Sequence, residues 1–224
     1  FRGCSNLTTL DVSGWDTSNV TDMSNAFFGC RGLTSLDVSS FNTSKTTNMG
    51  SMFGSCSRLT SLDLSGWDTS SVTHTGYMFS SCSALTSLDV SSFNTSSVVY
   101  MEAIFQGCSG LTSLDVSGFD TSKVTNMNSM FHDCHEFEGK GLENWTVTNV
   151  ENMESLFGYC DKFTGKEVED WDIQNVENMI DMFYECKNLN CNLDPWQTRF
   201  KKIECWDDMF VGCYKMKTPI WYKV

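Results

Sequence analysis

The sequence predicts an α/β solenoid of about eight stacked 26-residue repeats, with a parallel sheet on one face and short helices on the other. A strand-like apolar pattern and a pair of aromatic positions recur at a fixed interval. Cysteine recurs with them, nine times on a 26-residue grid whose last step is one residue longer: Cys4, Cys30, Cys56, Cys82, Cys108, Cys134, Cys160, Cys186 and Cys213. Self-similarity at a period of 20–50 residues indicates stacked supersecondary units.

The strand is predicted just after each grid cysteine. In residues 108–134, Leu111, Leu114 and Val116 have the spacing L-x-x-L-x-V, the strand signature of a leucine-rich repeat. Leu114 and Val116 share one side of this strand, and Asp115 lies on the other side with serines before and after it. The predicted solenoid is therefore of the leucine-rich-repeat type.

The helix is predicted in the second half of each repeat. Phe119 follows the strand as a corner aromatic, and residues 120–122 have turn and N-cap chemistry. Met127, Met130 and Phe131 then form part of an apolar stripe with helical spacing. A lone repeat could not bury this stripe, so neighbouring repeats must stack.

Two aromatic ladders run through the chain, and we expect both in the core because each repeat needs these positions buried. The corner aromatics are Trp15, Phe41, Trp67, Phe93, Phe119, Trp145 and Trp171. The aromatics of the predicted helices are Phe27, Phe53, Phe79, Phe105, Phe131, Phe157, Phe183 and Phe210.

Three segments are predicted along the solenoid. Residues 1–134 form regular Ser/Thr-rich repeats, and residues 135–186 form variant, Trp- and Glu-rich repeats in which Lys140 and Lys166 replace the strand leucine. In the variant repeats Leu142 and Val168 keep the next apolar site. Residues 187–224 form an atypical last repeat and a cap, since a terminal repeat must cover an open edge.

The segment LTSLDVSSFNTSKTTNMGSMFGSCS resembles the BspA-like class of leucine-rich repeats, a repeat family of unknown function first catalogued in mycoplasma surface lipoproteins. WTVTNVENMESLFGYC and WDIQNVENMIDMFYEC resemble its W-x-x-x-x-V-x-x-M-x-x-M-F variant. The resemblance covers residues 1–213. It implies a cell-surface or extracellular protein used for adhesion or display, with no catalytic residues, and it names no partner.

The net charge of −13 argues against nucleic-acid partners and against docking on an anionic membrane. The chain has no long apolar run, so no direct membrane insertion is expected. The grid cysteines are either small buried residues or form disulfides between adjacent rungs, which the strand spacing would allow. Cys191 and Cys205 lie off the grid and are the candidate disulfide.

The candidate ligand-facing surface is a ladder of mid-strand carboxylates flanked by serines. It consists of Asp11, Asp37, Asp63, Asp89 and Asp115 with Ser35, Ser61, Ser87 and Ser113. Carboxylates about 5 Å apart repel, so water, serine hydroxyls, protonation or a cation must relieve the charge. Ca²⁺ would suit dispersed carboxylates better than Mg²⁺, but the sequence carries no calcium-loop signature, so no cofactor and no metal site is assigned.

Five Asn-x-Ser/Thr sequons are glycosylation candidates if the protein is secreted through a glycosylating route: Asn6, Asn19, Asn42, Asn94 and Asn144. His132, Cys134 and His135 are close in sequence, but an inward Cys134 would make their side chains diverge. No nucleophile elbow or phosphate-binding loop is present, so an enzyme is not expected.

Two functions fit these features. The first is a non-enzymatic adhesion or binding protein, extracellular or displayed on a cell or virion surface, whose sheet face binds proteins or glycans. The second is a structural building block of a coat, sheath or virion surface, because near-identical repeats suit lattice contacts.

Overall fold

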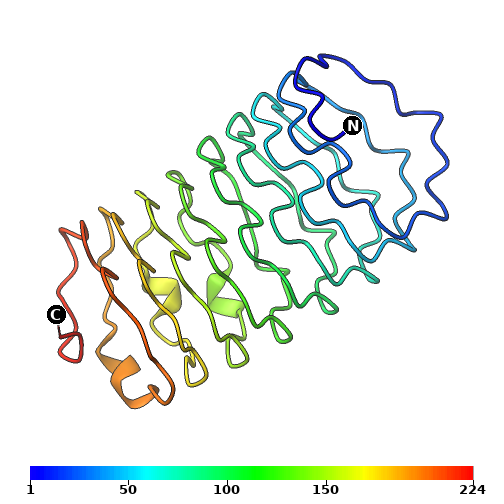
Figure 1. Ribbon diagram of the computed structural model, residues 1–224. Coiled ribbons are helices and arrows are strands. Elements are labelled where there is room, and N and C mark those ends of the chain that lie inside the picture. The colour runs from blue at the N-terminus through cyan, green and yellow to red at the C-terminus, as the bar shows by residue number, and fades with distance from the viewer. Residues whose placement is uncertain (224) are drawn as a thin grey trace.

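The computed structural model describes residues 1–223, which wind into a single curved stack of coils from the N-terminus to the C-terminus (Figure 1). Isolated parallel bridges join equivalent residues of consecutive coils, in the order Asp22, Asn48, His74, Tyr100, Asn126, Asn152, Asn178 and Cys205. The steps are 26 residues long except the last, which is 27, as in the cysteine grid. The stack confirms the predicted solenoid.

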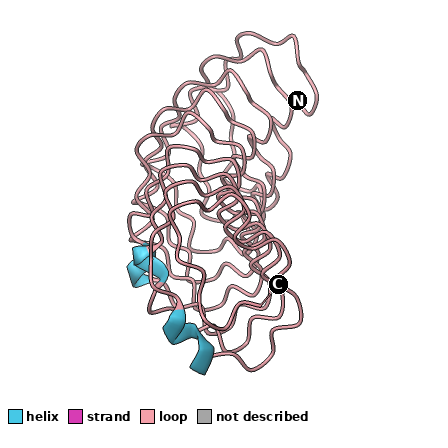
Figure 2. Cartoon of the chain, turned by 90° about the vertical axis from the view of Figure 1, so that its left-hand side faces the viewer, coloured by secondary structure: helices cyan, strands magenta, loops and turns pink. Residues whose placement is uncertain are grey.

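Helical structure in residues 1–223 is limited to three short 3-10 helices: η1 (Leu142–Asn144), η2 (Lys166–Val168) and η3 (Asp194–Thr198). They lie along one side of the stack, towards its C-terminal end (Figure 2). The prediction of a parallel sheet on one face and one short helix per repeat on the other is wrong for residues 1–223. The predicted strand face has one bridge, Ser87 to Ser113, and the predicted helices are runs of turns.

The predicted helices do not form, because their backbone N–H groups bond to carbonyls of the next coil and not to carbonyls four residues back in the same segment. Met127, Ser129, Phe131 and Asp133 each donate the backbone N–H to a carbonyl of the next coil, with N···O distances of 2.8–3.0 Å. The residues between them close turns, as Met130 N–H does on the Met127 carbonyl. Ser129 and Asp133 have φ of 54° and 60°, outside the helical region. The apolar spacing therefore marks the inward residues of a turn spiral.

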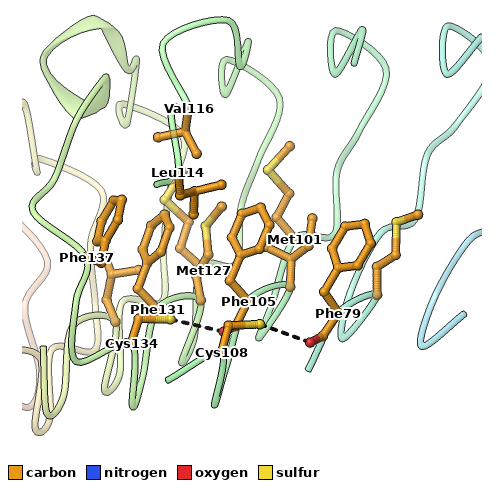
Figure 3. Packing of buried hydrophobic residues seen from close by; sticks show 14 of the residues in the cluster. Phe79, Met101, Phe105, Cys108, Leu114, Val116, Met127, Phe131, Cys134 and Phe137 are labelled. Carbon is orange, nitrogen blue, oxygen red and sulfur yellow. Dashed lines mark hydrogen bonds between the residues drawn. The ribbon is translucent and has the colours of Figure 1, made fainter. Parts of the chain in front are cut away.

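The core is a stack of one phenylalanine per coil, as the sequence predicts. From Phe27 to Phe210, consecutive ring centroids lie 5.7–5.9 Å apart with interplanar angles of 2–18°. Figure 3 shows three of these rings, Phe79, Phe105 and Phe131. The rings from Phe27 to Phe183 are fully buried, and each such burial stabilises the fold by about 1.5–3 kcal/mol. The corner aromatics are also buried, except Trp15, which is 41% exposed.

From Cys30 to Cys213 the grid cysteines line the core beside this stack, whereas Cys4 is exposed; within residues 1–223 every cysteine is a free thiol. From Cys30 onwards each grid thiol donates to a phenylalanine carbonyl of the preceding coil, at 2.9–3.2 Å (Figure 3). Burial raises the pKa of Cys56, Cys134 and Cys213 to about 12. Of the two alternatives, the structure shows the small buried residue.

A row of buried threonines forms a second link between coils, and this role was not predicted from the sequence. Thr95 Oγ1 donates to the Asp120 carbonyl at 3.0 Å and accepts from Asp120 N–H at 2.7 Å, so one hydroxyl bridges both backbone groups of the next coil. The members of this row, each at most 6% exposed and each donating to the next coil, are Thr17, Thr43, Thr69, Thr95 and Thr121.

The C-terminal segment departs from the pattern. Arg199 donates through Nη1 to the Glu169 and Trp171 carbonyls at 3.1 and 2.9 Å, which fixes it to the preceding coil. Cys191 and Cys205 are not paired: the Cys191 sulfur lies 4.0 Å from that of Met216, and the Cys205 thiol lies 3.8 Å from the Glu177 carbonyl. The division at residues 134 and 186 stays a prediction, although Leu142 and Val168 are buried as expected.

Candidate interaction surface

Each aspartate of the ladder is held in a local turn by the serine two residues later. Asp37 Oδ1 accepts from the backbone N–H of Ser39 at 3.0 Å and from its hydroxyl at 2.6 Å. The same backbone bond, at 2.9–3.0 Å, recurs at every other member: Asp11, Asp63, Asp89 and Asp115. Asp favours such Asx turns because its side chain reaches the backbone N–H two residues later, and the serine hydroxyl of the D-x-S spacing can add a second bond.

These hydrogen bonds stabilise the neighbouring carboxylates in their charged form. Serine hydroxyl and N–H donors lower the pKa of Asp11, Asp37, Asp63 and Asp89, and the neighbouring carboxylates oppose this only weakly. A lowered pKa means that the charged form is favoured. The ladder is therefore a row of ionised groups at neutral pH.

The ladder is accessible along its length. All five aspartates and the serines Ser35, Ser61, Ser87 and Ser113 are exposed. Around Ser87, Asp89, Ser113 and Asp115 the face is hollowed into an open depression of about 530 Å³. The structure thus brings the predicted ligand-facing residues together as one continuous acidic stripe.

The stripe ends where the variant repeats begin. Lys140 Nζ lies 2.7 Å from Asp115 Oδ2, and this ion pair further lowers the pKa of Asp115. Beyond it, Lys162 and Lys166 of one coil and Lys215 of a later coil line a second depression. Lys140 and Lys166 were expected only as replacements of the strand leucine, and the sequence pattern did not indicate that lysines of different coils meet here.

The five sequon asparagines are all at exposed positions. Asn42 and Asn94 have a structural part as well, since each side-chain oxygen accepts from the serine two residues later. Asn19 Oδ1 accepts from Lys45 Nζ at 2.6 Å. Whether any of them carries a glycan stays a prediction.

The histidines belong to local polar contacts. His135 Nδ1 lies 3.2 Å from Asp161 Oδ2, and His132 Nε2 lies 3.6 Å from Asp133 Oδ2, so the two rings face different partners while Cys134 is buried between them. Across residues 1–223, no three His, Cys, Asp or Glu side chains are grouped so as to hold a metal ion. The same part of the chain contains no helix long and apolar enough to cross a membrane.

The geometry defines a solenoid of 26-residue coils with a filled apolar interior and a charged outer face. The family model described as "Mycoplasma protein of unknown function, DUF285" matches residues 1–114 and 101–222. Because these matches span nearly all of the sequence, the chain belongs to this family, and the predicted resemblance to BspA-like leucine-rich-repeat proteins is confirmed.

Solved bacterial leucine-rich-repeat proteins overlap the chain at low identity. The protein TpLRR of T. pallidum is 19% identical over 62% of this chain and 69% of its own, with a TM-score of 0.41. A leucine-rich repeat protein of Eubacterium ventriosum is 15% identical over 86% and 65%, with a TM-score of 0.40. One of Bacteroides ovatus is 16% identical over 88% and 81%, with a TM-score of 0.26. A comparison with curated proteins gives no match.

Proposed function

We propose that this protein is a non-enzymatic binding module, extracellular or displayed on a cell or virion surface, that mediates adhesion by holding basic protein surfaces against its aspartate ladder. The observation that carries the proposal is that five exposed carboxylates, one per coil, are kept ionised and identically oriented by their serines. A partner that presents lysines or arginines at a similar spacing can make the same contact several times.

Repetition makes such a surface effective. A single exposed ion pair is worth about 0–1 kcal/mol, which is too little for a stable complex. Contacts made along one rigid stack become intramolecular after the first forms, so their weak energies combine. The Asx turns also keep the carboxylates ordered before binding, which reduces the entropy lost on association.

The main alternative is a structural building block in a coat, sheath or virion surface. It is favoured by the same regularity, because equal units on successive coils suit equal contacts to neighbouring copies. Cross-linking mass spectrometry in the native source separates the two functions. Cross-links to copies of the chain or to one fixed neighbour would favour the lattice, and cross-links to foreign proteins would favour adhesion.

The role of the ladder is tested with charge-removing variants that keep the fold. Asparagine already forms the same turn at Asn42 and Asn94, so the triple variant Asp37→Asn, Asp63→Asn, Asp89→Asn removes three charges and keeps the turns. The matched control is the equivalent change at three exposed aspartates of another row: Asp16, Asp68 and Asp120.

The readout is biolayer interferometry against the cross-linked partner. We expect the ladder variant to lose at least tenfold in affinity at 0.15 M salt and the control to lose much less. Equal affinity of the ladder variant and the unmodified protein would rule out the ladder as the binding surface.

A further inference from the structure

A depression of about 390 Å³ lies beyond the end of the aspartate ladder, and lysines dominate its lining. Its walls come from segments that are well separated in sequence: Glu138, Lys162, Thr164, Lys166, Asn188, Asn190 and Lys215. Three lysines face one glutamate, in a protein whose net charge is −13. By contrast, the depression around Ser87 and Asp115 contains aspartates and no lysine. This surface therefore has a local charge opposite to that of the chain as a whole.

The polar groups of the depression are only partly used by the protein. Lys162 Nζ pairs with Glu136 Oε2 at 2.5 Å, and Lys215 Nζ donates to Asn188 Oδ1. The Lys166 ammonium, the Thr164 hydroxyl and the Asn190 amide have no hydrogen-bond or ion-pair partner within residues 1–223. Within residues 1–223, the hollow is thus lined by one unpaired ammonium (Lys166), one unpaired carboxylate (Glu138) and two neutral hydrogen-bonding groups.

We propose that this depression binds an anionic oligosaccharide through its carboxylate or sulfate groups. Lysine presents a compact charge with three rotatable donors, which suits a single anionic group on a sugar. The hydroxyl of Thr164 and the amide of Asn190 provide the neutral hydrogen bonds that sugar hydroxyls need. The volume falls within the usual range of ligand pockets, about 300–1,000 Å³.

The backbone of the depression favours a sugar over an extended acidic peptide. Peptides that add to a surface as a strand use free N–H and C=O groups at an edge. Here the backbone bonds run between coils, as from Asn190 N–H to the Thr164 carbonyl at 2.9 Å and from Lys162 N–H to the His135 carbonyl at 3.1 Å, so the hollow lies on the face of the stack and not at a free edge. The negative charge of the remaining chain is screened beyond about 8 Å at physiological salt, so the local lysines decide which ligand binds.

This inference goes beyond the proposed function, because the two surfaces differ in sign and select different partners. The lysine depression takes anions, whereas the aspartate ladder takes cationic groups. Removing charge from one surface leaves the other intact, so each proposal can fail without the other.

Isothermal titration calorimetry with defined probes tests the site on the whole chain. The probes are a heparin tetrasaccharide, which has sulfates and carboxylates, a hyaluronan tetrasaccharide, which has carboxylates only, and a hexaglutamate peptide. The test variant is Lys166→Gln with Lys215→Gln. The control is Lys45→Gln with Lys123→Gln, two exposed lysines outside the depression that give the same loss of charge.

We expect one or both tetrasaccharides to bind and the test variant to bind about tenfold more weakly, a loss of about 1.4 kcal/mol, with the control unchanged. Binding of both tetrasaccharides identifies the carboxylate as sufficient, and binding of the heparin fragment alone identifies the sulfate. No binding of either, an equal loss in the control, or hexaglutamate binding as tightly as the sugars would overturn the proposal. All four lysines are exposed, and unchanged thermal melting verifies that the variants fold.

Discussion

Replacing Thr95 by valine tests whether the buried hydroxyls hold the coils together. Valine has nearly the same shape as threonine, so packing is kept, and the change removes the 3.0 Å bond to the Asp120 carbonyl and the 2.7 Å bond from Asp120 N–H. Each lost hydrogen bond costs about 1 kcal/mol net, and more where the partner stays away from water. Thr95 is 3% exposed, so we expect a loss of about 2–3 kcal/mol in the free energy of unfolding.

The assay is urea unfolding followed by circular dichroism, with two control variants. Thr95→Ser keeps the hydroxyl and loses one methyl group, for which we expect a loss of about 1 kcal/mol. Thr125→Val changes a partly buried threonine whose hydroxyl makes no hydrogen bond within residues 1–223, so it should be nearly neutral. Equal stability of Thr95→Val and Thr125→Val would refute the bridging role of the threonine row.

Three further outcomes are expected. Ser81→Gly should raise the free energy of unfolding by about 0.5–1 kcal/mol in the same urea assay. Ser81 has a φ of 59°, which is strained for a residue with a Cβ, and Gly107 takes the same repeat position with a φ of 69°. A destabilised variant would contradict this. Burial raises the pKa of Glu167, so the folded state favours its protonated form. The resulting stabilisation is fully present below about pH 4 and is lost as the pH rises through the folded-state pKa. Glu167→Gln should therefore melt at a higher temperature than the unmodified protein at pH 7 and at a similar one at pH 4; the exposed Glu151→Gln is the control, and no gain at pH 7 would count against the reasoning. Iodoacetamide under native conditions should label the exposed Cys4 and spare Cys134, whose pKa burial raises to about 12; rapid labelling of Cys134, read by peptide mass spectrometry, would show that the thiol ladder is not protected.

The burial pattern was largely readable from the sequence. The period identified the inward phenylalanines and corner aromatics, and Leu142 and Val168 were placed inside despite the lysines beside them. The two-residue alternation of apolar and polar residues likewise put the aspartates on the outer face. Burial is a property of single positions that every repeat must satisfy, so repetition amplifies its signal.

The hydrogen-bond partners of these residues could not be predicted from the sequence. A stripe such as Met127, Met130 and Phe131 has the same spacing in a helix and in this turn spiral, because both need one inward face. The difference is that Ser129 N–H bonds the Glu154 carbonyl in the next coil and not a carbonyl in its own turn. Local propensity carries no information about such a partner, and tertiary context overrides it.

By itself, the sequence determined the period of the solenoid, the residues of its core and the row of carboxylates on its surface. Only the tertiary structure decided that turns replace sheet and helices, that the grid thiols and the Thr95 hydroxyl bond the neighbouring coils, and that Lys162, Lys166 and Lys215 line one depression. The physical reason is distance along the chain: these contacts join residues about one repeat or more apart, and stacking alone sets which groups meet.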